Sequence, residues 1–132
     1  MTLDIRGLAP LLQVFDMPAS IHFYRDILGF EVVNTSETAE KFDWPLLRLN
    51  GVELMLNTAY ESDERRRVPD ANRVAAHADT GLYFSCPDVE QAYVQLRIKG
   101  LDVAEPVIRT YGMKQLNVTD PDGYNLCFQW PA

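Results

Sequence analysis

Apolar and polar residues along the first half of the chain follow two periods, which together predict a strand, a helix and three further strands. Residues 6–15 alternate with the period of a strand. An amphipathic helix is predicted to follow between Asp16, a potential N-cap, and Gly29, a stop signal. Three more strands are predicted at 30–35, 44–49 and 52–57, and Asn50-Gly51 predicts a tight hairpin between the last two.

The second half of the chain repeats this order. A strand at 81–86 precedes a helix from Pro87-Asp88 to Gly100, and strands follow at 101–108, 113–119 and 124–130. Residues 58–80, between the two copies, are polar and charged without a clear period, which predicts a linker. We therefore expect a single α+β domain of two βαβββ modules, residues 1–57 and 81–132, joined by the linker.

Each predicted strand has one apolar face and one mixed face, because successive side chains point to opposite sides of a sheet. The apolar faces are expected to pack against the helices. The mixed faces carry polar groups such as Gln13 and Gln129 among apolar side chains such as Leu11, Met55 and Tyr83. A mixed face either meets solvent, as in many antiparallel sheets, or lines a concave ligand cleft. The apolar members favour the cleft.

Composition narrows the classes of partner. The chain is 47% hydrophobic and 23% charged, as in ordinary globular proteins, and its net charge of −7 argues against nucleic acid and anionic membranes. Arg65-Arg66-Arg67 is a local exception, and the acidic residues around it predict a solvated loop. Two cysteines, Cys86 and Cys127, are too few for a disulfide framework, and no apolar stretch approaches a membrane span. These features predict a reduced, cytoplasmic protein.

Three segments of the sequence resemble the vicinal oxygen chelate superfamily, the glyoxalase, bleomycin-resistance and extradiol-dioxygenase group. They are residues 12–30, which contain Phe23-Tyr24-Arg25-Asp26-Ile27-Leu28-Gly29-Phe30, then Val52-Glu53-Leu54-Met55-Leu56, and then Asp120-Pro121-Asp122-Gly123-Tyr124 before an apolar closing strand. The resemblance covers nearly the whole chain. It implies two βαβββ modules whose curved mixed sheets enclose a cleft for a small organic ligand, commonly within a homodimer.

The resemblance also implies where a metal would bind, because metal-dependent relatives hold a divalent ion with four side chains, one on each of four cleft strands. The matching positions here are Ala9, Glu53, Gly81 and Cys127, and a shift of two residues would place Met55 at the second position. Alanine and glycine carry no donor atom, and the remaining carboxylate and thiol fall short of the three protein ligands of a catalytic zinc site. No metal site and no cofactor are therefore predicted.

The remaining titratable candidates in the sequence are two histidines and Glu53. His22 is predicted on a solvated helix face and His77 in an ordinary polar loop. Glu53 would be a possible general base if an apolar cleft raised its pKa, and otherwise it is wet or paired with Arg48 across the hairpin. The candidate ligand contacts combine aromatic area, an anion clamp and soft or polar groups: Leu11, Gln13, Trp44, Arg48, Met55, Tyr83, Tyr111, Cys127 and Gln129.

These observations favour a metal-independent homodimer that binds a small organic molecule, as the bleomycin-sequestering members of the superfamily do. The alternative is a glyoxalase-like lyase or isomerase that uses Glu53 with a divalent metal ion held by unexpected ligands. A third possibility is an interaction module that uses the fold only for dimer contacts.

Overall fold

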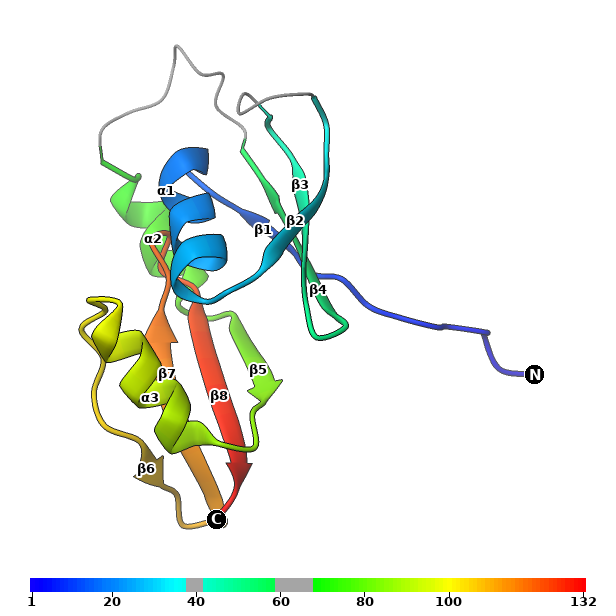
Figure 1. The fold of residues 1–132 in the computed structure, drawn as a ribbon. Coiled ribbons are helices and arrows are strands. Elements are labelled where there is room, and N and C mark those ends of the chain that lie inside the picture. The colour runs from blue at the N-terminus through cyan, green and yellow to red at the C-terminus, as the bar shows by residue number, and fades with distance from the viewer. Residues whose placement is uncertain (38–41, 59–67) are drawn as a thin grey trace. The chain divides into compact units, whose positions relative to one another are not determined.

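The computed structural model describes residues 1–37, 42–58 and 68–132 of the chain (Figure 1). These residues form two compact units, Met1–Arg66 and Arg67–Ala132, each built around its own four-stranded sheet. The predicted solvated loop at Arg65-Arg66-Arg67 lies outside the described residues. Within the described part of the chain, no helix has both the length and the apolar character to cross a membrane.

The first unit follows the predicted order of strand, helix and three strands. Its elements are β1 (Leu11–Gln13), α1 (Met17–Ile21), η1 (His22–Ile27), β2 (Glu31–Thr35), β3 (Pro45–Leu49) and β4 (Val52–Asn57). The sheet order is β1-β4-β3-β2, with β1 parallel to β4 and the other neighbours antiparallel. Leu47, Leu54 and Leu56 are completely buried on its apolar face. The predicted strand at 6–15 is longer than the observed β1, because Pro10 has no N–H to donate to a ladder.

The helix of the first unit begins and ends as its sequence predicts. The Asp16 side chain caps it by accepting from the Ala19 backbone N–H. The last turns widen into the π-helix η1, in which the Leu28 N–H donates to the carbonyl of Phe23, five residues earlier, at 3.0 Å. Gly29 then ends the helix with a φ of 96°.

The second unit contains the second βαβββ module and one additional helix. Its elements are α2 (Ala71–His77), β5 (Gly81–Ser85), α3 (Val89–Ile98), β6 (Val107–Ile108), β7 (Met113–Thr119) and β8 (Asn125–Pro131). The sheet order is β5-β8-β7-β6, with β5 parallel to β8. Helix α3 packs on β7 and β8, where Leu116 and Leu126 are completely buried (Figure 1). The α+β class with two βαβββ modules is thus confirmed.

The structure differs from the sequence prediction in two places within the second unit. The segment predicted as a linker contains helix α2, whose N-cap Asp70 accepts from the backbone N–H of Asn72 at 2.9 Å. The strand predicted at 101–108 shortens to Val107–Ile108. Pro106 precedes the observed strand and has no N–H for pairing, so the ladder starts after it.

Candidate functional site

The mixed face of the first sheet brings together four of the predicted ligand contacts. Leu11 of β1 stands opposite Met55 of β4, and Gln13 stands opposite Asn57. The Asn57 side-chain amide donates to Gln13 Oε1 at 3.2 Å. Arg48 of β3 lies in register with Glu53 of β4.

Glu53 is held by Arg48 across the hairpin. The Arg48 guanidinium donates to Glu53 Oε2 through Nη2 at 2.8 Å and through Nε at 3.2 Å. The Asn50-Gly51 turn makes this pairing possible, because both residues have positive φ (50° and 83°) and close a two-residue hairpin. With both side chains partly exposed, the pair contributes only about 0–1 kcal/mol to stability. Of the two surroundings that the sequence left open for Glu53, the structure shows the ion pair with Arg48.

The mixed face of the second sheet carries a hydrogen-bonded chain of side chains. Tyr83 of β5 stands opposite Cys127 of β8, and Gln115 of β7 stands opposite Gln129 of β8. Arg109, which follows β6, donates through Nε to Gln115 Oε1 at 3.1 Å, and Gln115 Nε2 donates to Gln129 Oε1 at 2.9 Å. Gln115 is buried, with 5% of its surface exposed.

Arg109 and Gln115 were not among the residues predicted from the sequence. Gln115 could have been found from strand parity, since it alternates with the buried Leu116 and therefore shares the mixed face with Gln129. Arg109 had no such signal, because only the register of β6 with β7 brings it beside Gln115.

Cys127 lies on this face as a neutral thiol. Burial raises its pKa above the usual value, and the positive charge of Arg109 lowers it in part. Cys86 also has a raised pKa, first through burial and then through the negative charge of Asp88. Both thiols are free. At neutral pH these surroundings therefore favour the neutral thiol over a thiolate nucleophile.

We expect slow alkylation of both cysteines by iodoacetamide at neutral pH, accelerating as the pH rises through and beyond the ordinary thiol range of about 8.5. Raised pKa values mean less thiolate at any given pH. Arg109→Gln removes the charge that lowers the Cys127 pKa, so Cys127 should react still more slowly, with Cys86 as the internal control. Peptide mass spectrometry measures both rates, and a Cys127 rate that levels off below neutral pH would contradict this environment.

Two of the predicted ligand contacts, Trp44 and Tyr111, lie outside the strand pairs described above. Trp44 precedes β3 and is half-buried, and its backbone carbonyl accepts from the Ser36 N–H at 2.9 Å. Tyr111 lies in the turn between β6 and β7 with 67% of its surface exposed. Their roles in ligand contact remain predictions.

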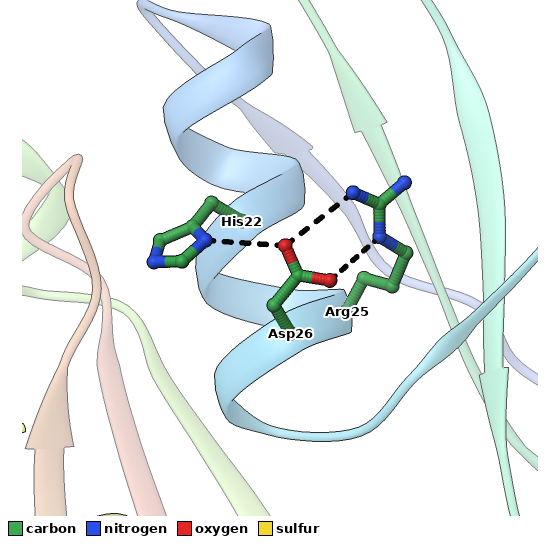
Figure 2. A network of polar contacts seen from close by, with 3 residues as sticks. All are labelled: His22, Arg25 and Asp26. Atoms are coloured by element: carbon green, nitrogen blue, oxygen red, sulfur yellow. Dashed lines mark hydrogen bonds and ion pairs between the residues drawn. The ribbon is translucent and has the colours of Figure 1, made fainter. Parts of the chain in front are cut away.

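Each of the two histidines contacts other groups of the fold. His22 lies on the solvated helix face predicted for it, with Nδ1 3.1 Å from Asp26 Oδ2, and Arg25 Nε donates to Asp26 Oδ1 at 2.9 Å (Figure 2). Hydrogen bonds from Arg25 and then His22 lower the pKa of Asp26. The prediction of His77 as a loop residue is wrong. It ends α2, stacks on Tyr124 with ring centroids 4.0 Å apart, and lies with Nδ1 2.7 Å from the Asp122 carbonyl oxygen.

The residues at the four metal-ligand positions of the resemblance do not fit a divalent ion. Ala9 and Gly81 supply no donor, Glu53 is bound by Arg48, and Cys127 is a buried thiol with a raised pKa. Among the residues that the structure describes, no three His, Cys, Asp or Glu side chains gather where they could hold a metal ion. The donor chemistry of these positions therefore disagrees with the metal-dependent pattern.

A shallow pocket of about 140 Å³ opens on the helix side of the second sheet. Its lining residues come from the segment that enters α3, the start of β7 and the end of β8: Pro87, Asp88, Val89, Glu90, Lys114, Trp130 and Pro131. An ion pair between Lys114 and Glu90 lies among them. The pocket is smaller than the roughly 300 Å³ of typical ligand sites and contains none of the predicted contacts.

Comparison with known proteins agrees with the fold. Metallothiol transferase FosB of Staphylococcus haemolyticus is 30% identical over 115 residues, which cover 86% of this chain and 75% of that protein. The bleomycin-binding protein in complex with bleomycin superposes with a TM-score of 0.72 at 18% identity, covering 97% of this chain and all of that one. The antibiotic-binding protein TnmS3 from Streptomyces sp. CB03234 has a TM-score of 0.70 at 18% identity, covering 99% of this chain and all of that one.

The family comparison covers most of the sequence. Residues 8–128 match the model of the Glyoxalase/Bleomycin resistance protein/Dioxygenase superfamily. This range includes all three segments that carried the resemblance, so the resemblance is confirmed. The chain belongs to the Glyoxalase/Bleomycin resistance protein/Dioxygenase superfamily.

Proposed function

We propose that this chain is a metal-independent binding protein for a small organic molecule. The observation that carries the proposal is the pair of mixed sheet faces, on which apolar side chains such as Met55 and Tyr83 stand beside hydrogen-bonded amides. Such a combination of apolar lining and a few placed polar groups is typical of ligand sites. The four positions that bind metal in other members supply at most two donor side chains here.

Relatives in the same superfamily support this proposal. One of the similar structures is described as a bleomycin-binding protein in complex with bleomycin, and another as an antibiotic-binding protein. Their low identity supports only a shared fold, so the ligand of this chain need not be theirs.

A second candidate is an enzyme of the metal-dependent branch that uses Glu53. The similarity to FosB favours it, because the name metallothiol transferase denotes metal and thiol chemistry. Against it stand the Arg48–Glu53 ion pair and the residues Ala9 and Gly81. Metal content distinguishes these two candidates, and its measurement does not require the substrate to be known.

Metal content and ligand-induced stabilisation test the proposal. Protein purified without chelator should contain far less than one equivalent of zinc, nickel, iron or manganese. A panel of organic molecules that includes bleomycin should yield at least one that raises the melting temperature saturably. A ligand at 100 times its dissociation constant stabilises the folded state by about 2.7 kcal/mol.

The outcome for Glu53 separates the two candidates. Stoichiometric metal that is lost in Glu53→Gln but retained in Glu105→Gln, a control at an exposed carboxylate, would overturn the binding proposal in favour of the enzyme. Absence of any thermal shift across the panel would favour the third possibility, an interaction module.

We further propose that the protein forms a homodimer in the cytoplasm. The residues before β1 form an extended N-terminal arm (Figure 1). Three large apolar side chains of the arm, Leu3, Ile5 and Leu8, expose 83%, 75% and 88% of their surface. Apolar side chains grouped in this way are typical of a surface that another chain covers. The free thiols Cys86 and Cys127 suit a reducing compartment.

Sedimentation velocity tests the dimer. We expect a species of twice the 15.0 kDa chain mass, which the triple substitution Leu3→Ser, Ile5→Ser and Leu8→Ser should shift toward the monomer. A monomer at all concentrations in the unmodified protein would contradict the proposal.

A further inference from the structure

The arginines of this chain differ in the partners that hold them. Several arginines donate to carboxylates: Arg6 to Asp4, Arg25 to Asp26, Arg48 to Glu53 and Arg97 to Asp102. Arg109 instead donates to the neutral side-chain amide of Gln115 at 3.1 Å. Its positive charge is therefore held in place by a group that does not neutralise it, in a chain whose net charge is −7.

The hydrogen-bonded chain from Arg109 has a fixed direction. A guanidinium has no acceptor atom, so the oxygen of Gln115 must face Arg109. The nitrogen of Gln115 then faces Gln129 and requires the oxygen of Gln129 as its acceptor, at 2.9 Å. The amide nitrogen of Gln129 is left as the outer group. The two outer members of this hydrogen-bonded series, Arg109 and Gln129, consequently both present hydrogen-bond donors.

The burial of Gln115 makes this arrangement rigid. Only 5% of its surface is exposed, so its amide stays in one orientation and anchors the Nε edge of Arg109. The two Nη groups of Arg109 are on the opposite side of the guanidinium from the Cα and are the pair of donors that can clamp an oxyanion bidentately. The Arg109 side chain itself is exposed.

Apolar and aromatic side chains border these donors on the same sheet face. Val107 stands in register with Gln115 and exposes 46% of its surface. Tyr83 stands in register with Cys127 and exposes 67%. The face therefore offers apolar area beside a cation and an amide donor, which complements an organic molecule with an acidic group.

We propose that Arg109, oriented by Gln115, anchors the acidic group of the ligand, and that the ligand class of this protein is an organic oxyanion with an apolar body. The proposal rests on the proposed binding function and narrows it to one chemical class. Arg109 would supply the bidentate contact and Gln129 a further donor, while Gln115 acts as a positioning residue that fixes both.

The test uses two fluorescent probes that differ in one acidic group. 8-Anilinonaphthalene-1-sulfonate carries a sulfonate, and N-phenyl-1-naphthylamine is its uncharged counterpart. The unmodified protein should bind the sulfonate probe more tightly. Arg109→Gln should weaken that binding about 10- to 100-fold, as expected for a lost charge-assisted contact, and leave the neutral probe within about twofold.

Two further variants distinguish a site from general electrostatics. Arg97→Gln removes one exposed charge from the same unit and should leave both probes unchanged. Gln115→Glu keeps Arg109 but gives it a neutralising carboxylate in a nearly identical shape, and it should weaken the sulfonate probe alone. Far-ultraviolet circular dichroism checks that each variant is folded.

Three results would overturn the inference. Equal affinity of the unmodified protein for the two probes would refute the anion preference while leaving a binding function intact. An equal loss of sulfonate binding in Arg97→Gln and Arg109→Gln would mean that the net charge of the protein, and not a site at Arg109, controls the affinity. No binding of either probe would count against both the inference and the proposed function.

Discussion

Replacing Gly123 with alanine is expected to lower the free energy of unfolding by about 2–4 kcal/mol. Gly123 has a φ of 88°, which a side chain rarely adopts. A Cβ at this position would also lie 2.6 Å from the carbonyl oxygen of Val74 and 2.8 Å from its Cγ1. Helix α2 would have to move away from the turn, because the closest atom belongs to its backbone.

Gly100 offers a matched control for this substitution. It has nearly the same φ, 89°, and lies in the same unit, but a Cβ there would meet nothing within 4 Å. Gly100→Ala should therefore show only the conformational cost, about 1 kcal/mol. Urea denaturation followed by circular dichroism measures both losses. Equal losses would mean that α2 does not pack closely on the turn.

Replacing Asp120 with alanine is the second large effect that we expect, a loss of about 2–4 kcal/mol. The Asp120 carboxylate is 4% exposed, and its Oδ1 accepts from the backbone N–H groups of Asp122 at 2.9 Å and Tyr124 at 2.8 Å. Alanine leaves both donors buried without this acceptor. Each such orphaned group costs about 1–3 kcal/mol.

Asp120→Asn provides the control, because its side-chain oxygen can occupy the position of Oδ1. We expect it to retain most of the stability that alanine loses. Amide hydrogen exchange at Asp122 and Tyr124 gives an independent measure, since both amides should exchange faster in Asp120→Ala than in Asp120→Asn. Similar stability of the two variants would show that the turn does not depend on this acceptor.

Local features of the fold could be predicted because their causes are near in sequence. Asp16 and Asp88 cap helices through backbone groups three residues away. The Asn50-Gly51 turn fixes the register of β3 and β4, so the ion pair between Arg48 and Glu53 was one of the alternatives open to sequence analysis.

Helix α2 was not predicted, although Asp70 caps it through local backbone groups as Asp16 and Asp88 cap theirs. The helix has no buried residue, and three of its four apolar side chains are alanines, so its apolar face is weak, and its position depends on packing against the distant Gly123 turn. The structural role of His77 could not be predicted either. Its partners Asp122 and Tyr124 are 45 and 47 residues away, so its role as a structural residue has no local signal.

By itself, the sequence determined the superfamily, the doubled βαβββ order and the residues on each strand face, because periodicity, caps and turns act over a few residues. Only the tertiary structure decided which side chains meet across strands. The register of β6, β7 and β8 assembles Arg109, Gln115 and Gln129 into one directed chain of hydrogen bonds. Unlike β3 and β4, these strands are not joined by a two-residue turn, so their register also depends on which faces the whole sheet buries.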